Sequence, residues 1–162
     1  MNVELDEISQ FFNSLGREKE LVMMTAEAVM ACDFVAGTRS QGELAGLTGI
    51  RTQYGFIPSL FIVVKEKYQG LGLGHKLLET NISYARKKYN FLSLDTWQRP
   101  EYDAALHIYK KHGFRPVYKK GSHIWMCIPF NKKGNMVRNF LPLIYTVLPV
   151  ISALYSKIIR RK

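Results

Sequence analysis

Apolar residues recur every three or four positions in several parts of the chain, which is the spacing of an amphipathic helix. The clearest case is residues 6–15, where Ile8, Phe11, Phe12 and Leu15 would share one face. The segment that follows is rich in Glu, Leu, Met and Ala, residues with high helix propensity. On these grounds we predict helices over residues 6–15, 18–31, 75–89 and 103–112.

Short runs of β-branched and aromatic residues, separated by turn-forming stretches, predict strands. Residues 57–64 are apolar almost throughout, without alternation, so we expect this strand to be buried on both faces near the middle of a sheet. The predicted strands are residues 34–39, 44–53, 57–64, 91–97, 117–119 and 123–129. Because strands and helices mix throughout, we predict an α/β (α+β) layer structure with mixed strand directions.

The end of the chain has a different pattern. Residues 139–156 contain no charged side chain, whereas Arg138 precedes them and Lys157, Arg160, Arg161 and Lys162 follow. Eighteen residues is at the short limit for a membrane-spanning helix, and Pro142 and Pro149 would interrupt one. We therefore divide the chain into a domain, residues 1–133, and an extension, residues 134–162. The extension would pack on the domain, form a homodimer, or lie on an anionic membrane surface.

Composition and charge narrow the classes of partner. The 162 residues, 47% of them hydrophobic, suffice for one folded domain. Of the net charge of +10, most lies late in the chain: from Ala104 onward there are twelve Lys or Arg and no Asp or Glu. This balance favours an anionic partner. Aromatic residues are not interleaved with the lysine pairs, so we expect no nucleic acid.

Cys32 and Cys127 are too few and too far apart for a disulfide framework, and the first residues lack the pattern of a secretory signal. We therefore expect a cytoplasmic protein, at the inner face of the membrane if the extension is an anchor.

A glycine-rich turn between a predicted strand and a predicted helix is the main candidate for chemistry. Such a turn presents main-chain N–H groups at a helix N-terminus, which is suited to binding phosphate. It does not match a Walker loop, because Lys76 is followed by Leu77 rather than Ser or Thr. Neither does it match a dinucleotide fingerprint, since His75 or Leu77 stands where the third glycine is required.

Two motifs in this region resemble those of the GNAT N-acetyltransferase superfamily. Gln69, Gly72 and Gly74 fit its acyl-CoA-binding signature, Gln-x-x-Gly-x-Gly. Residues 105–114 resemble its A-x-x-L-Y-x-x-x-G-F segment, with Ile108 replacing Leu and Tyr109 in the tyrosine position. The resemblance covers residues 34–129, extends to the first 33 residues only in helical character, and does not include the chain beyond residue 133.

The resemblance implies a GNAT-like central mixed sheet flanked by helices, and acetyl-CoA as co-substrate. The strand before the glycine turn would separate from the next strand, and the pantetheine arm would bind main-chain groups in the gap. By this resemblance, the pantetheine site would comprise Ile62, Val63 and Val64. The main-chain amides for the pyrophosphate would be those of Gln69, Gly70, Leu71, Gly72, Leu73, Gly74 and His75.

The resemblance also implies direct transfer of an acetyl group to a primary amine. Tyr109 matches the usual general acid, which would protonate the departing thiolate; the alternative is a ring packed in the core. Asp95, on the predicted fifth strand, is the candidate base, and its alternative role is to order the following loop. Tyr102 stands where the family commonly has Asn. We expect no metal, because the four histidines lack ligand spacing.

Several readings of function stay open at this point. The amine acceptor could be a protein N-terminus or lysine, an amino sugar, a polyamine or a drug-like amine. The protein could also be a catalytically silent module that binds CoA or a partner. A third possibility is a membrane-peripheral acyltransferase that acts on a lipid-linked or glycan precursor.

Overall fold

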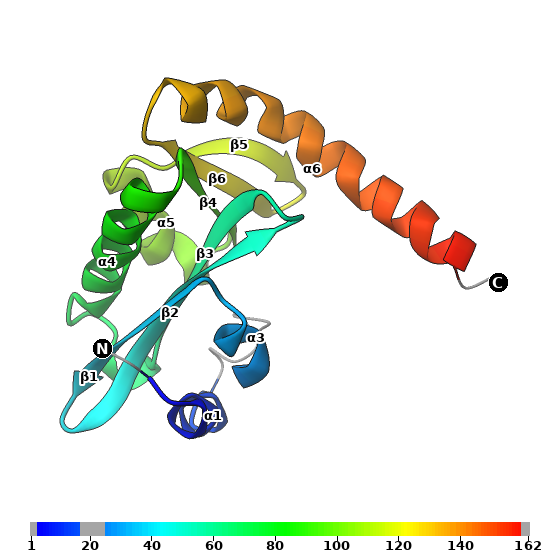
Figure 1. Ribbon diagram of the computed structural model, residues 1–162. Helices are drawn as coiled ribbons and strands as arrows, with labels where there is room; N and C mark the ends of the chain where they lie inside the picture. Colours follow the sequence, from blue (N-terminus) through cyan, green and yellow to red (C-terminus); the bar gives the residue numbers. More distant parts are fainter. Residues whose placement is uncertain (1–2, 17–24, 160–162) are drawn as a thin grey trace.

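The computed structural model describes residues 3–16 and 25–159; at residue 148 and from 150 onward it describes the backbone only. A six-stranded sheet with the order β1-β2-β3-β4-β6-β5 runs through the molecule (Figure 1). All neighbouring strands are antiparallel except β3 and β4, which are parallel. The strands are β1 (Phe34–Ser40), β2 (Glu43–Gln53), β3 (Ile57–Val64), β4 (Phe91–Trp97), β5 (Arg115–Lys120) and β6 (His123–Pro129).

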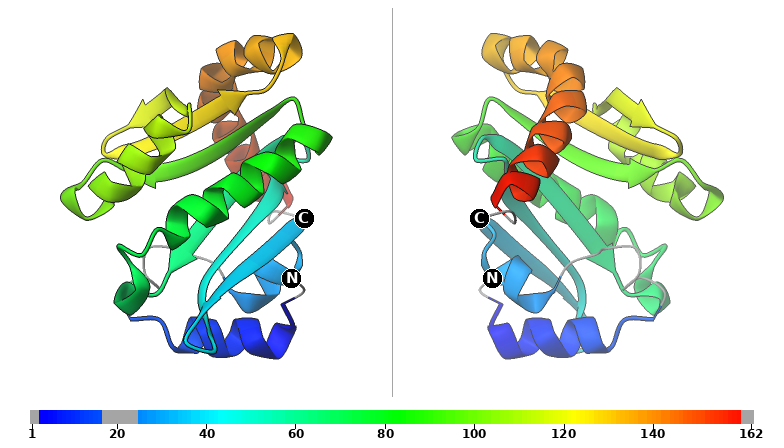
Figure 2. Two further views of the ribbon diagram at one scale, coloured as in Figure 1. Left: turned by 90° about the vertical axis from the view of Figure 1, so that its left-hand side faces the viewer. Right: turned by 90° about the vertical axis from the view of Figure 1, so that its right-hand side faces the viewer.

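Helices cover both faces of this sheet. One face carries α4 and α5, and the opposite face carries α1, α3 and the first half of α6 (Figures 1 and 2). The mixed sheet with helices on both sides confirms the predicted fold class. The helices are α1 (Leu5–Asn13), α3 (Ala26–Met30), α4 (Leu73–Lys88), α5 (Asp103–Lys111) and α6 (Lys132–Ile159), with short 3₁₀ helices η1 (Glu66–Tyr68) and η2 (Pro100–Tyr102).

Alternation along each strand divides the core into layers. On β3, Leu60 faces the cluster under α4, whereas Ile57 and Val63 face the opposite layer. The prediction that this strand is buried on both faces is therefore confirmed. Ile62 and Val64, near the end of the strand, are only half-buried, because they border the cavity described below.

The second predicted helix, residues 18–31, is only partly visible. Its last turns form α3, where the Thr25 side chain accepts a hydrogen bond from the Ala28 N–H at 3.2 Å and caps the helix. Residues 18–24 of that prediction lie outside the described residues. The other predicted elements agree with the structure to within a few residues at each end.

The first half of α6 is part of the folded core. Leu141 is fully buried and Tyr145 is 6% exposed, and both pack against Ile57, Phe91 and Cys127. At the start of this helix, Gly134 lies so close to the Asn90 carbonyl that a Cβ would collide with it. The proposed domain boundary at residue 133 thus falls in the first turn of α6, without a break in packing. None of the helices in the described part of the chain is both long and apolar enough to cross a membrane.

Replacing Leu141 with Ala should lower the free energy of unfolding by about 2 to 5 kcal/mol, because a buried leucine leaves a cavity when it is truncated. Leu143, on the same helix but 63% exposed, is the matched control, and Leu143→Ala should cost less than about 0.5 kcal/mol. Urea unfolding followed by circular dichroism measures both values. Equal effects of the two substitutions would contradict the packing of α6 on the sheet.

Candidate active site

The two parallel strands, β3 and β4, meet at one end and separate toward the other. Their pairing consists of one residue pair, Ser59 opposite Ser93. On their outer sides, β3 stays paired with β2 up to Val64 and β4 stays paired with β6 up to Trp97. The sheet therefore opens between β3 and β4, and a cavity of about 570 Å³ occupies this gap.

Most of the residues predicted for the site meet at this cavity. The exception is Leu71, which is 63% exposed and does not line it. The predicted residues that line the cavity are Ile62, Val63, Val64, Gln69, Gly70, Gly72, Leu73, Gly74, His75, Asp95 and Tyr109. They come from β3, the glycine turn with the start of α4, β4 and α5.

The separation of the strands leaves one edge of β3 without a strand partner. The Lys65 N–H donates to the Ala45 carbonyl of the β2 side at 3.0 Å. Because main-chain groups alternate in direction along an antiparallel ladder, Val63 also faces β2, whereas Ile62 and Val64 direct their N–H and C=O groups into the gap. The Gln69 side chain donates to the Val64 carbonyl at 3.2 Å, which ties the glycine turn to this edge.

The glycine turn presents main-chain donors without partners. Gly70 and Gly72 have positive φ angles of 79° and 75°, which glycine adopts readily. The first helical bond of α4 runs from the Lys76 N–H to the Gly72 carbonyl, and within the described residues the N–H groups of Leu73, Gly74 and His75 have no acceptor. The Gln69 N–H, in contrast, already donates to the Glu66 carbonyl at 3.0 Å.

There is also room at this turn for a ligand. A Cβ added at Gly70 or Gly72 would meet no atom within 4 Å. Unpaired amides at a helix N-terminus, next to open space, form a site that fits a diphosphate. This fit supports the predicted role of the turn, with the donors concentrated at the first residues of α4.

A charged cluster that the sequence reasoning missed holds the turn in place. Glu43, at the start of β2, accepts hydrogen bonds from the Tyr68 hydroxyl at 2.5 Å and from Lys65 at 3.0 Å, and it also pairs with Lys67. Hydrogen bonds from Lys67, Tyr68 and Lys65 lower the pKa of Glu43 to about 2, so this carboxylate is ionised at neutral pH. No local pattern announces the cluster, because Glu43 lies more than 20 residues from its partners.

Tyr109 lies on α5 with its half-buried ring at the cavity wall, near Phe114 at 6.1 Å between ring centroids. Burial, and to a lesser degree the charge of Asp95, raises the pKa of Tyr109 to about 12. The phenol therefore keeps its proton at neutral pH, as a general acid must. The ring both packs in the core and reaches the cavity, so the two roles weighed from the sequence do not exclude each other.

Asp95 has a partner that the sequence did not reveal. Its Oδ2 lies 2.9 Å from the His123 Nε2 on the neighbouring strand β6. The His123 ring stacks on Trp97 at 4.3 Å and contacts Trp125 at 3.9 Å between centroids. Asp95 is opposite Trp125 and His123 is opposite Trp97, so the pair is diagonal across the two strands. Only the strand register brings these residues together.

The described residues contain no group of three or more His, Cys, Asp or Glu placed to hold a metal ion. The cysteines are buried or half-buried, and burial raises the pKa of Cys127 to about 12 and also raises that of Cys32.

Comparison with known proteins decides the family. Residues 5–114 match the family described as "Acetyltransferase (GNAT) family". The chain belongs to the GNAT acetyltransferase family. The match ends before β5, so the GNAT family region includes the gap between β3 and β4, the glycine turn and Tyr109, but not His123 or α6.

Solved GNAT structures share the fold. An acetyltransferase from Streptococcus pneumoniae is 23% identical with a TM-score of 0.63, over 81% of this chain and 98% of that chain. The structure of yncA from Salmonella typhimurium with its cofactor acetyl-CoA is 14% identical with a TM-score of 0.63, over 82% and 93%. The ribosomal-protein-S18-alanine N-acetyltransferase from Escherichia coli is 19% identical with a TM-score of 0.62, over 81% and 92%. The curated proteins include no significant sequence match.

One departure from the GNAT pattern now has a location. Tyr102, at the position where the family commonly has Asn, also lines the cavity, and burial raises the pKa of its phenol. The cavity wall at this point is thus aromatic, and Tyr102 changes the shape and the hydrogen-bonding capacity of the wall beside α5.

Proposed function

We propose that this GNAT protein transfers an acetyl group from acetyl-CoA to a primary amine by direct attack. The observation that carries the proposal is the single cavity where unpaired helix amides, an open strand edge and a protonated tyrosine come together. These are a seat for a diphosphate, a main-chain edge for an amide-containing arm, and a proton donor for a thiolate.

The main chain would bind the donor. The diphosphate would accept hydrogen bonds from the amides at the start of α4, and the pantetheine amides would pair with Ile62 and Val64 as an added strand would. This arrangement places the thioester in the gap between β3 and β4. A strand N–H there can donate to the oxyanion of the tetrahedral intermediate, which is typically worth about 3 kcal/mol.

Side chains would handle the protons. The amine nitrogen attacks the thioester carbon, the carbon–sulfur bond breaks, and Tyr109 donates its proton to the departing sulfur. An alkylamine has a pKa of about 10, so a base must remove its proton before or during attack. We assign this step to Asp95 with His123, whose ring can pass a proton to or from the carboxylate over 2.9 Å.

Asp95→Asn should lower kcat about 100-fold, because the asparagine amide cannot accept the amine proton. The Kd for acetyl-CoA should stay within about twofold. Asp103→Asn, an exposed residue at the start of α5 that does not line the cavity, is the matched control and should leave kcat unchanged. If Asp95→Asn has full turnover, Asp95 only orders the loop that follows β4.

The acceptor has to be found by experiment. The purified protein should bind acetyl-CoA in calorimetry and release free thiol when supplied with the right amine. The panel should contain peptide N-termini, lysine, amino sugars and polyamines, and peptides beginning with alanine are included because of the E. coli structural neighbour. Binding of acetyl-CoA without turnover on any amine would support the alternative, a catalytically silent CoA-binding module. No binding at all would end both readings.

A further inference from the structure

The outer side of α6 carries an exposed apolar stripe. Met136, Phe140, Leu143 and Val147 are 59%, 57%, 63% and 39% exposed. Their spacing of four, three and four residues places them along one line of the helix, separate from the face of Leu141 and Tyr145 that packs on the sheet. In the sequence the same spacing continues at Ile151, Leu154 and Ile158. Soluble proteins rarely leave so many large apolar side chains exposed together.

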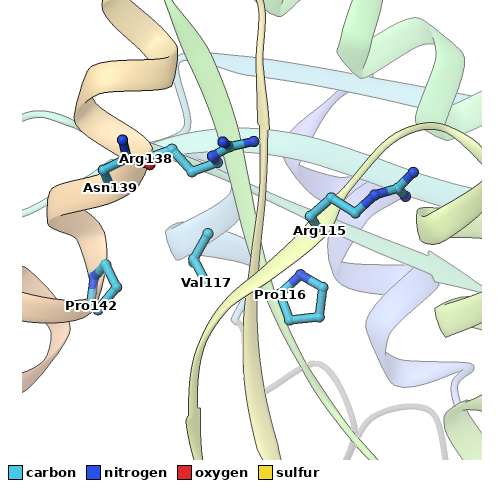
Figure 3. A pocket seen from close by; sticks show the side chains of 6 residues that line it. All are labelled: Arg115, Pro116, Val117, Arg138, Asn139 and Pro142. Atoms are coloured by element: carbon cyan, nitrogen blue, oxygen red, sulfur yellow. The ribbon is translucent and has the colours of Figure 1, made fainter.

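Basic residues surround this stripe. Exposed Lys132 and Lys133 begin the helix, and in the sequence Lys157, Arg160, Arg161 and Lys162 follow its apolar part. Between β5 and α6 lies an open pocket of about 370 Å³ that contains Arg115 and Arg138 and no acidic residue (Figure 3). Arg115 donates to the Lys110 and Phe114 carbonyls, whereas Arg138 has no hydrogen bond or ion pair to any residue that the structure describes.

The helix also extends beyond the sheet. Its first half is docked on β4, β5 and β6, whereas its C-terminal end projects away from the strands in Figure 1. Twenty-eight helical residues correspond to a length of about 42 Å. The extended end is therefore accessible to a large, flat partner.

We propose that this stripe, Met136, Phe140, Leu143 and Val147, binds the surface of an anionic lipid membrane, with α6 lying in the plane of the interface. Helices of this kind insert an apolar face among the acyl chains, while Lys and Arg beside that face contact the lipid phosphates. The charges are complementary, because the last 59 residues carry bases and no acid. The inference goes beyond the proposed acetyl transfer and does not depend on it.

Charge argues against a second copy of the chain on the same stripe. In a symmetric pair of α6 helices, each copy would bring Lys132, Lys133 and the basic residues beyond 156 to the interface, and no acidic residue of that half could neutralise them. An anionic membrane supplies the missing negative charge.

Vesicle binding by the full-length protein tests the proposal. The protein should sediment with vesicles of phosphatidylcholine and phosphatidylglycerol in equal parts and remain in solution with phosphatidylcholine alone. Raising NaCl to about 0.5 M should weaken binding, because the charges involved are exposed. Failure to bind the anionic vesicles, or equal binding to both kinds, would overturn it.

Point substitutions identify the surface without opening the core, whereas a deletion from residue 139 would remove the buried Leu141 and Tyr145. Phe140→Ser with Leu143→Ser should weaken vesicle binding at least about tenfold. The matched control is Leu5→Ser with Met30→Ser, two exposed apolar residues on α1 and α3. Lys132→Glu with Lys133→Glu should weaken binding about tenfold, and Lys110→Glu with Lys111→Glu, on α5, should have less effect.

The oligomeric state separates the membrane from a second copy. Light scattering should find a monomer for both the parent protein and the Phe140→Ser, Leu143→Ser variant. If instead the parent is a dimer that the variant dissociates, the stripe binds a second copy and the proposal is wrong. None of these measurements uses acetyl transfer, so failure of the enzyme assay would leave the membrane result standing, and the reverse also holds.

Discussion

Tyr109→Phe should lower kcat about a thousandfold while the Kd for acetyl-CoA changes less than about twofold. The substitution removes only the hydroxyl, so the ring still packs against Phe114 and the cavity keeps its shape. The thiolate then leaves without a proton donor, which raises the barrier of the chemical step and not that of binding. Thiol release under saturating substrate measures kcat, and calorimetry measures the Kd.

Tyr84→Phe is the control for this prediction. Tyr84, on α4 outside the cavity, loses one hydroxyl that donates to the Asp33 carbonyl at 3.1 Å, and turnover should be unchanged. The pH profile gives a second check. Since burial raises the pKa of Tyr109 to about 12, its proton is retained as the pH rises from about 7 to 10, and kcat should not fall there through loss of the acid. Full turnover of Tyr109→Phe would remove Tyr109 from the mechanism.

Gly72→Val should weaken binding of acetyl-CoA at least about a thousandfold. The branched side chain would occupy the open space beside the amides of α4, where the diphosphate would lie, and two or three hydrogen bonds to a charged group would be lost. Calorimetry with acetyl-CoA measures the effect directly. A fold-change below tenfold would place the diphosphate elsewhere.

The chain offers a closely matched control for this substitution. Gly42, in the turn between β1 and β2, has a φ angle of 82° and also has nothing within 4 Å of an added Cβ. Gly42→Val therefore carries a similar backbone cost, about 1 to 2 kcal/mol, at a position away from the cavity. It should lower the unfolding free energy about as much as Gly72→Val but leave acetyl-CoA binding intact.

Much of this architecture could be predicted because its causes are local. Helical spacing of apolar residues, β-branched runs and positive-φ glycines act over a few residues, so α4, α5 and all six strands were located from the sequence. The Gln69, Gly72 and Gly74 pattern likewise identified the turn that the structure places at the start of α4. The family model then confirmed the GNAT resemblance over residues 5–114.

The tertiary structure alone decided which distant residues meet. The strand register set His123 beside Asp95, and Glu43 reached Lys65 and Tyr68 across more than 20 residues. It also divided α6 into one face buried by the sheet and another exposed to solvent, although the sequence is apolar on both. A sequence determines which segments are helical, extended or turning, because those preferences are local. Partners across a sheet depend on how whole elements pack, and that is a property of the folded chain.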